Sequence, residues 1–163
     1  MNATSISTLT TLGLMTKAQK LKNLERSILI NASAEKVWRV LTDFENWKNW
    51  NSFIVRSEGQ AKVGSKLKNT FDNGGKEMVF QPKVLRVEPN KELIWKGQLL
   101  MPGIFDGTHG FRIEEVGPNQ VRFVNYESFK GILSSMILKK IYDDTARGFE
   151  RMNQELKEQA EKQ

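Results

Sequence analysis

His109 and Glu127 are the two side chains of this 163-residue sequence whose types and spacing could carry acid–base chemistry. Between them, residues 117–119 (Gly-Pro-Asn) separate two strand-like segments and favour a tight turn. A turn centred on Pro118 would place His109 directly opposite Glu127 on the concave face of a sheet. A shift of one residue would remove this pairing, because neighbouring residues of a strand point to opposite faces.

Such a pair would suit proton transfer. His109 could act as acid or base, with Glu127 orienting it or raising its pKa. Asn125 or Tyr126 could bind a developing oxyanion, although Tyr126 is expected to point away from the histidine. The alternative is a structural hydrogen bond between His109 and Glu127 with no catalytic role. The sequence shows no nucleophile–base arrangement and no phosphate-binding loop.

Composition excludes several other kinds of site. There is no cysteine, so disulfides, thiolate nucleophiles and zinc held by cysteines are ruled out. The single histidine rules out the usual histidine-based metal clusters, and we expect neither a metal nor a cofactor. The formal net charge is +6, but basic residues are spread along the chain and mixed with acids. This distribution is not typical of a nucleic-acid-binding protein.

The residues expected around the pair indicate a cavity. Polar groups would interrupt an aromatic lining on the concave face, and buried polar groups are costly unless they find partners or water. Several of them among aromatic residues suggest a cavity with a polar end. The alternative is that they lie at the sheet margins or satisfy one another. The polar residues are Asn69, His109, Asn125 and Glu127, and the aromatic ones are Phe71, Phe80, Trp95, Phe111, Phe123 and Phe129.

Apolar periodicity predicts the elements that must position these groups. Residues 24–31 are typical of a strand, Ser33 is the expected N-cap of a short helix, and a second short helix or turn spans residues 44–50. Six strands joined as hairpins follow, over residues 67–71, 77–84, 84–87, 93–99, 111–113 and 121–129. A long amphipathic helix runs over residues 134–161. The sequence therefore predicts an α+β fold in which a seven-stranded antiparallel sheet wraps around the C-terminal helix.

Turn residues also predict the register of the earlier hairpins. A two-residue loop at residues 73–74 (Asn-Gly) would set Phe80 opposite Leu67. The next turn would set Val84 opposite Trp95.

Residues 1–22 are expected to form an N-terminal extension, flexible or weakly helical, before a single ligand-binding domain over residues 23–163. The extension is rich in serine and threonine, and its apolar residues precede its lysines, the reverse of a signal peptide. No stretch approaches the ~18–20 apolar residues needed to cross a bilayer, so we expect no stable membrane insertion. A cytoplasmic location is the default.

Five segments stand in an order and spacing that resembles a known superfamily. They are residues 30–38 (INASAEKVW), 41–47 (LTDFENW) with 50–51 (WN), 93–97 (LIWKG), 105–111 (FDGTHGF) and 127–131 (ESFKG). Together they resemble the START/Bet v 1-like (SRPBCC) superfamily, specifically its bacterial polyketide cyclase/dehydrase-like members. The resemblance implies a helix-grip fold enclosing a deep cavity. Members bind lipids, sterols, polyketides, plant hormones or other apolar ligands, and some catalyse aromatic-ring closure or dehydration.

The first hypothesis is binding of an apolar or amphipathic small molecule of lipid, polyketide or aromatic type. The alternatives are a cyclase or dehydratase that uses His109 and Glu127 as an acid–base pair, and a protein-interaction module with the same fold. The sequence does not indicate an oligomeric state. The expected ligand-binding residues are Trp47, Trp50 and Phe53 at the cavity mouth, Phe71, Phe80, Trp95, Phe111, Asn125 and Phe129 along its walls, and Ile137 and Ile141 on the helix as its lid.

Overall fold

The computed structural model describes residues 22–72, 75–99 and 101–162. The N-terminal extension expected at residues 1–22 therefore lies, apart from Lys22, outside the described residues.

Eight strands, two α-helices and one 3-10 helix form within the described residues. In chain order they are β1 (Asn23–Ile30), α2 (Ala34–Thr42), η1 (Phe44–Asn49), β2 (Ile54–Glu58), β3 (Lys68–Asp72), β4 (Glu77–Phe80), β5 (Lys83–Glu88), β6 (Glu92–Leu99), β7 (Phe105–Gly117), β8 (Gln120–Lys130) and α3 (Ser134–Lys162).

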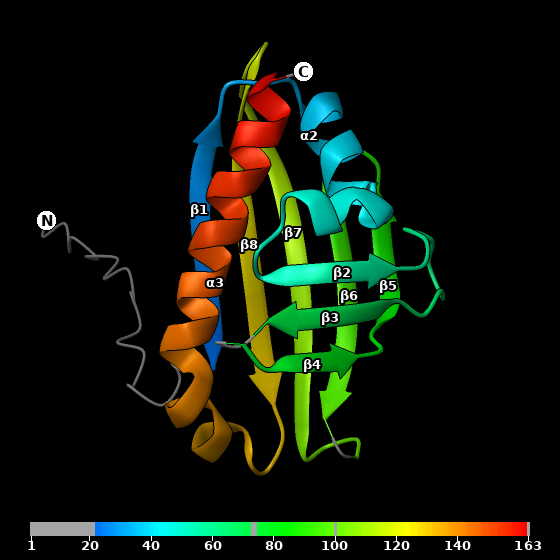
Figure 1. The fold of residues 1–163 in the computed structure, drawn as a ribbon, viewed down its shortest axis with the longest axis vertical. Helices are drawn as coiled ribbons and strands as arrows, with labels where there is room; N and C mark the ends of the chain where they lie inside the picture. Colours follow the sequence, from blue (N-terminus) through cyan, green and yellow to red (C-terminus); the bar gives the residue numbers. More distant parts are fainter. Residues whose placement is uncertain (1–21, 73–74, 100, 163) are drawn as a thin grey trace, which may run out of the picture.

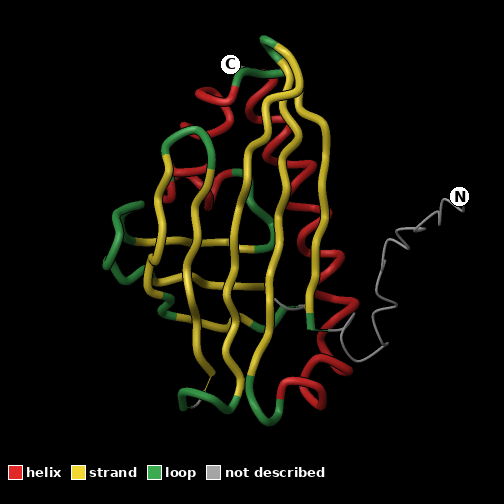
Figure 2. Tube along the Cα trace, turned by 180° about the vertical axis from the view of Figure 1, so that it is seen from behind, coloured by secondary structure: helices red, strands yellow, loops and turns green. Residues whose placement is uncertain are grey.

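The strands make two antiparallel sheets. Five long strands pair in the order β1-β8-β7-β6-β5, and β2, β3 and β4 form a small sheet. The small sheet, α2 and α3 lie on one face of the large sheet, with the strands of the small sheet crossing those of the large one (Figure 1). From behind, the other face of the large sheet is uncovered (Figure 2). The predicted α+β helix-grip arrangement is confirmed, and the long helix occupies nearly the predicted residues.

The strand absent from the sequence prediction is β2. Its two buried side chains are those of Ile54 and Ser57, so the inward face is partly polar and the apolar alternation is lost. Ser57 is buried because its hydroxyl donates to Oδ1 of Asn69 on β3 at 2.7 Å. The strands divide into two sheets near Pro82, which lies between β4 and β5 and has no N–H to continue a ladder.

Local sequence signals explain both α-helices. The Ser33 hydroxyl accepts a hydrogen bond from the backbone N–H of Lys36 at 3.3 Å, which confirms the predicted N-cap of α2. In α3 the side chains of Phe149, Met152 and Leu156 form the buried stripe, as their spacing predicts. Gly148 stands beside this stripe because the ring of Phe53 packs directly on its backbone, where a Cβ atom would collide.

Two of the three predicted registers are confirmed. His109 pairs with Glu127 and Val84 pairs with Trp95. The prediction for the Asn-Gly turn is wrong by two residues, since Phe80 lies opposite Asn69 rather than Leu67. The connection is four residues long because Asp72 already pairs with Glu77. The observed register differs from the predicted one by two residues, an even number, so the Phe80 side chain stays on the predicted face of the sheet.

Candidate functional site

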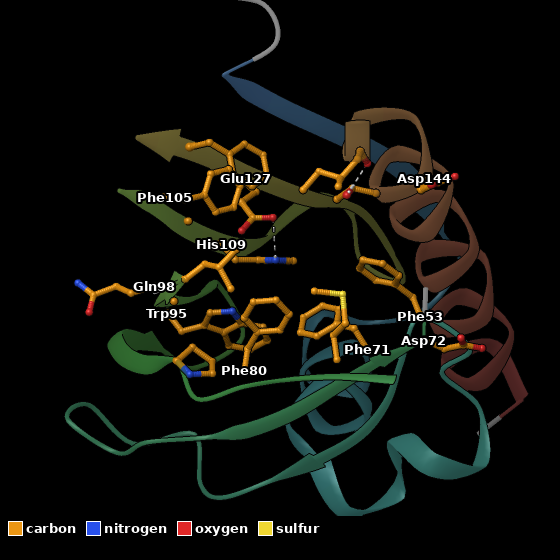
Figure 3. A pocket seen from close by; sticks show the side chains of 18 of the residues that line it. Phe53, Phe71, Asp72, Phe80, Trp95, Gln98, Phe105, His109, Glu127 and Asp144 are labelled. Carbon is orange, nitrogen blue, oxygen red and sulfur yellow. Dashed lines mark hydrogen bonds and ion pairs between the residues drawn. The ribbon is translucent and has the colours of Figure 1, made fainter. Parts of the chain in front are cut away.

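A cavity of about 780 Å³ lies between the large sheet, the small sheet and α3. Its apolar wall comes from all three layers, which surround the pocket in Figure 3. The solvent-accessible part of its lining includes polar and charged side chains: Ser52, Asp72, Gln98, Asp144, Arg147 and Arg151. The wall itself includes Phe53, Phe71, Met78, Phe80, Trp95, Leu99, Phe105, Phe129 and Ile141, with the buried His109 and the partly buried Glu127 as polar members.

Strands β6 and β7 form the floor of this cavity. Four cross-strand pairs follow one another on the concave face: Leu93 with Phe111, Trp95 with His109, Gly97 with Gly107, and Leu99 with Phe105. Large side chains therefore stand on both sides of a pair that has none. A Cβ atom on Gly97 would meet only Pro82, at 3.9 Å. The glycine pair leaves the floor open to the cavity.

Glu127 on β8 occupies part of the space above the floor. A Cβ atom on Gly107 would collide with Oε1 of Glu127, so the missing side chain lets the carboxyl group lie over the backbone of β7. The Glu127 side chain keeps 17% of its surface exposed, and it lines the cavity. The carboxyl group is thus available to a molecule inside.

His109 lies beneath the apolar wall with one nitrogen held by the core. Its Nε2 lies 2.8 Å from Oδ1 of Asn125. Nδ2 of Asn125 points instead to the Met152 sulfur at 3.9 Å, so the amide oxygen is the group that faces the imidazole. A neutral His109 must then carry its proton on Nε2 and donate it to Asn125. Its Nδ1 is left as an acceptor.

The acceptor nitrogen of His109 faces Glu127, with 3.7 Å between Nδ1 and Oε2 (Figure 3). Burial among the rings of Trp95, Phe111 and Phe149 lowers the pKa of His109 to about 3, although the hydrogen bond to Asn125 acts in the opposite direction. Burial likewise raises the pKa of Glu127 to about 8. At neutral pH the pair is therefore a neutral imidazole facing a protonated carboxyl group.

This arrangement differs from the one expected from sequence. Glu127 was expected to orient His109 or raise its pKa, but Asn125 is the group that orients the imidazole and burial dominates its pKa. The 3.7 Å separation is too long for a hydrogen bond between the two. What the structure offers to the cavity is a carboxylic acid that can donate a proton, with a neutral base next to it.

The structure brings part of the predicted set of ligand-binding residues to the cavity and places the rest elsewhere. Those that line it are Phe53, Phe71, Phe80, Trp95, Phe129 and Ile141, along with His109 and Glu127. Trp47, Trp50, Phe111, Asn125 and Ile137 are not among its lining residues.

Those five residues lie in or against the solid core. Trp47 is fully buried, donates from Nε1 to the Leu41 carbonyl at 3.1 Å, and contacts Phe111 edge to face. Asn125 acts through His109 instead of reaching the cavity.

The role of Gly97 and Gly107 is not predicted from the sequence. No side-chain pattern marks them, and no register between residues 93–99 and 105–111 is predicted from the sequence, so their pairing becomes visible only in the structure. Among the described residues no group of three or more histidine or acidic side chains could hold a metal ion. Within the same residues no helix is long and apolar enough to cross a membrane.

The fold and cavity define a helix-grip protein, and comparison with known proteins identifies the family. Residues 22–161 match the family described as "Polyketide cyclase / dehydrase and lipid transport". The chain belongs to this family, as the resemblance indicated. No curated protein matches the sequence.

Solved structures support the same fold. One similar structure is the ZhuI aromatase/cyclase from Streptomyces sp. R1128, with a TM-score of 0.69, 13% identity, and coverage of 86% of this chain and 93% of that one. A hypothetical protein from Helicobacter pylori has a TM-score of 0.71, 14% identity and 98% coverage of both chains. A protein from Thermus thermophilus has a TM-score of 0.68 and 17% identity, covering 85% of this chain and 96% of the other. At these identities the likeness shows the fold alone.

Proposed function

We propose that this protein binds an apolar or amphipathic small molecule, of lipid, polyketide or aromatic type, in the cavity above Gly97 and Gly107. The observation that carries the proposal is an aromatic-walled cavity of about 780 Å³ whose floor lacks side chains at Gly97 and Gly107. A volume in this range suits a drug-sized ligand. Burial of apolar surface would supply most of the affinity, at about 25 cal/mol per Å² before the costs of association.

The polar groups add orientation to this apolar site. Glu127 is protonated at neutral pH and can donate a hydrogen bond to a carbonyl or hydroxyl oxygen of the ligand. Other polar side chains that line the cavity, including Ser52, Arg147 and Arg151, are exposed to solvent. A ligand with an apolar body, one internal oxygen and a polar end facing solvent would match this distribution.

A titration with aminoanthracene, a neutral fused-ring fluorophore, tests the proposal. We expect its fluorescence to rise on binding to the wild-type protein, and Gly97→Leu to weaken binding at least about tenfold because the new side chain fills the floor. Gly97→Ala is the matched control, since it adds one methyl group where only Pro82 is near, and it should keep most of the affinity. Equal affinity of wild type and Gly97→Leu, both remaining folded, would contradict the proposal.

The second candidate function is dehydration of a β-hydroxy ketone, and the geometry of the pair favours it, because His109 and Glu127 both line the cavity with Nδ1 and Oε2 3.7 Å apart. Nδ1 of His109 would accept the proton from the carbon next to the carbonyl, and Glu127 would protonate the leaving hydroxyl group. A carbon–carbon double bond forms and water departs. The reaction leaves an imidazolium and a carboxylate 3.7 Å apart. Return of the proton from Nδ1 to Glu127 restores the starting state, so no other proton donor is needed.

A β-hydroxytetralone, which loses water to give a fluorescent naphthol, is a suitable probe for this activity. If the pair is catalytic, Glu127→Gln should lower kcat at least about a hundredfold, the usual scale of general-acid catalysis. The same variant should bind aminoanthracene within about twofold of wild type, since the two side chains have nearly the same volume. No turnover by the wild type, or a parallel loss of turnover and binding, would reject catalysis and leave the binding proposal in place.

A further inference from the structure

Two loops at one end of the molecule expose large apolar side chains. Residues 101–104 connect β6 to β7, and residues 131–133 connect β8 to α3. Both loops lie at the lower end in Figure 1. Ile132 is 84% exposed in the second loop and Met101 is 62% exposed in the first, while Met136, in the first turn of α3, is 55% exposed. We call Met101, Ile132 and Met136 the apolar tip.

Backbone hydrogen bonds hold the two loops together. The N–H of Ile132 donates to the Gly103 carbonyl at 3.0 Å, and the N–H of Leu133 donates to the Ile104 carbonyl at 3.1 Å. Gly131, with a φ of 114°, allows the close approach, because a Cβ atom there would collide with the Ile104 carbonyl. The apolar tip is therefore a built projection at the end of the fold.

Three lysines flank the second loop of the apolar tip in sequence. Lys130 precedes the second loop, and Lys139 and Lys140 follow in α3, all three exposed. The segment 130–142 contains no acidic residue. None of these lysines forms an ion pair with another described residue. In the first loop the acidic neighbour, Asp106, is already paired with Lys96 at 3.0 Å.

We propose that the apolar tip and its lysines dock this protein on the surface of an anionic lipid bilayer. Exposed apolar side chains enter the boundary between headgroups and acyl chains, and nearby lysines gain from the negative surface potential. A second copy of this chain fits less well, because docking tip to tip would bring both sets of lysines together. A projection also suits a deformable bilayer better than a flat protein face.

The apolar tip borders one end of the cavity. Leu99 and Phe105, which flank the first loop, line the cavity, and so does Phe129 just before the second. Docking through this end would bring the cavity next to the bilayer. The docking proposal does not depend on a bound ligand, so it stands or falls separately from the proposed binding function.

Vesicle sedimentation with purified full-length protein tests the docking. Vesicles of phosphatidylcholine alone are compared with vesicles of equimolar phosphatidylcholine and phosphatidylglycerol, at increasing salt. We expect binding to the anionic vesicles that weakens with salt, and at least about tenfold weaker binding to the neutral ones. The double variant Met101→Glu/Ile132→Glu should lose at least about tenfold in partition coefficient.

The matched control is Val63→Glu/Val79→Glu. These side chains are 60% and 55% exposed and lie outside the two loops, in the β2–β3 connection and on β4. The control carries the same change in charge and should retain most of the binding. An equal loss of vesicle binding in both double variants would show that the electrostatic attraction is not localised at the apolar tip, and would overturn the proposal. It would also be overturned by absence of binding to anionic vesicles, or by a concentration-dependent dimer that Met101→Glu/Ile132→Glu dissociates.

Discussion

The concave face of β6 and β7 is filled at one end and hollow at the other, although the same two strands build both. In the filled part, Phe111 contacts Trp47 and stacks on Phe123, with ring centroids 5.8 Å apart. In the hollow part, Gly97 and Gly107 face each other without side chains. Aromatic residues are abundant in both parts, so their number does not distinguish them. The position of the cavity is set by where the two glycines pair.

Truncating an aromatic residue in each part should separate them most clearly. Phe111→Ala removes a fully buried ring and should lower the free energy of unfolding by about 3–5 kcal/mol. Phe80→Ala removes a partly exposed ring from the cavity wall and should cost less than half of that. Urea unfolding followed by tryptophan fluorescence measures both. Equal losses would mean that the hollow part is as tightly packed as the filled part.

The pH dependence of stability should report the protonation of His109 and Glu127, which lie between the filled and the hollow part. From pH 4.5 to about 8 folded Glu127 keeps a proton that the unfolded chain releases, so stability falls as pH rises. From about pH 3 to 6.5 the unfolded chain binds a proton that folded His109 does not, so stability rises with pH. The two opposing contributions leave a plateau between pH 4.5 and 6.5.

Each of two substitutions should remove one sloping part of the pH profile of stability. Glu127→Gln should abolish the decline between pH 6.5 and about 8, and His109→Gln should abolish the decline from pH 4.5 to about 3. Thermal unfolding across this range provides the measurement. An unchanged alkaline limb in Glu127→Gln would show that the carboxyl group is ionised in the folded protein at neutral pH.

Ligand affinity should respond to the same proton, with a smaller effect. An apolar ligand displaces water from Glu127 and so favours its protonated form. Aminoanthracene should therefore bind more weakly as the pH rises through about 8, and Glu127→Gln should bind equally well on both sides of that pH. A wild-type affinity that does not change across this range would mean that the ligand does not approach the carboxyl group.

The smallest effect is expected from deleting residues 1–20, which precede both parts. β1 begins at Asn23, and the family match begins at residue 22. The melting temperature should therefore stay nearly unchanged. A large drop, measured by circular dichroism, would show that the N-terminal segment belongs to the folded domain.

The parts that sequence predicted well are those set by local chemistry. Gly117, Pro118 and Asn119 mark a tight connection, with Gly117 paired to Gln120, and a register shift between Glu115 and Gly117 then sets His109 opposite Glu127. The Asn-Gly pair at residues 73–74 predicted the register of its hairpin less well, because the connection between β3 and β4 is four residues long and not two. The N-cap at Ser33 and the stripe of α3 likewise depend on neighbouring residues only.

What sequence could not predict depends on residues far apart in the chain. Trp47 and Phe53 are both aromatic and close in sequence, yet one fills the core and the other lines the cavity. Their roles depend on how η1 and the small sheet pack against the large sheet. The protonation of Glu127 is also invisible in the sequence, because it follows from burial that the whole fold creates.

The amide spectrum of the protein during titration with aminoanthracene tests the central claim most directly. The account predicts that the amide signals of Gly97 and Gly107, on the cavity floor, shift as the fluorophore is added. The signals of Gly64, in a turn, and Gly117, at the end of β7, should stay in place because neither residue lines the cavity. Shifts confined to Gly64, Gly117 or other surface positions, with Gly97 and Gly107 unmoved, would contradict the assignment of the cavity as the binding site.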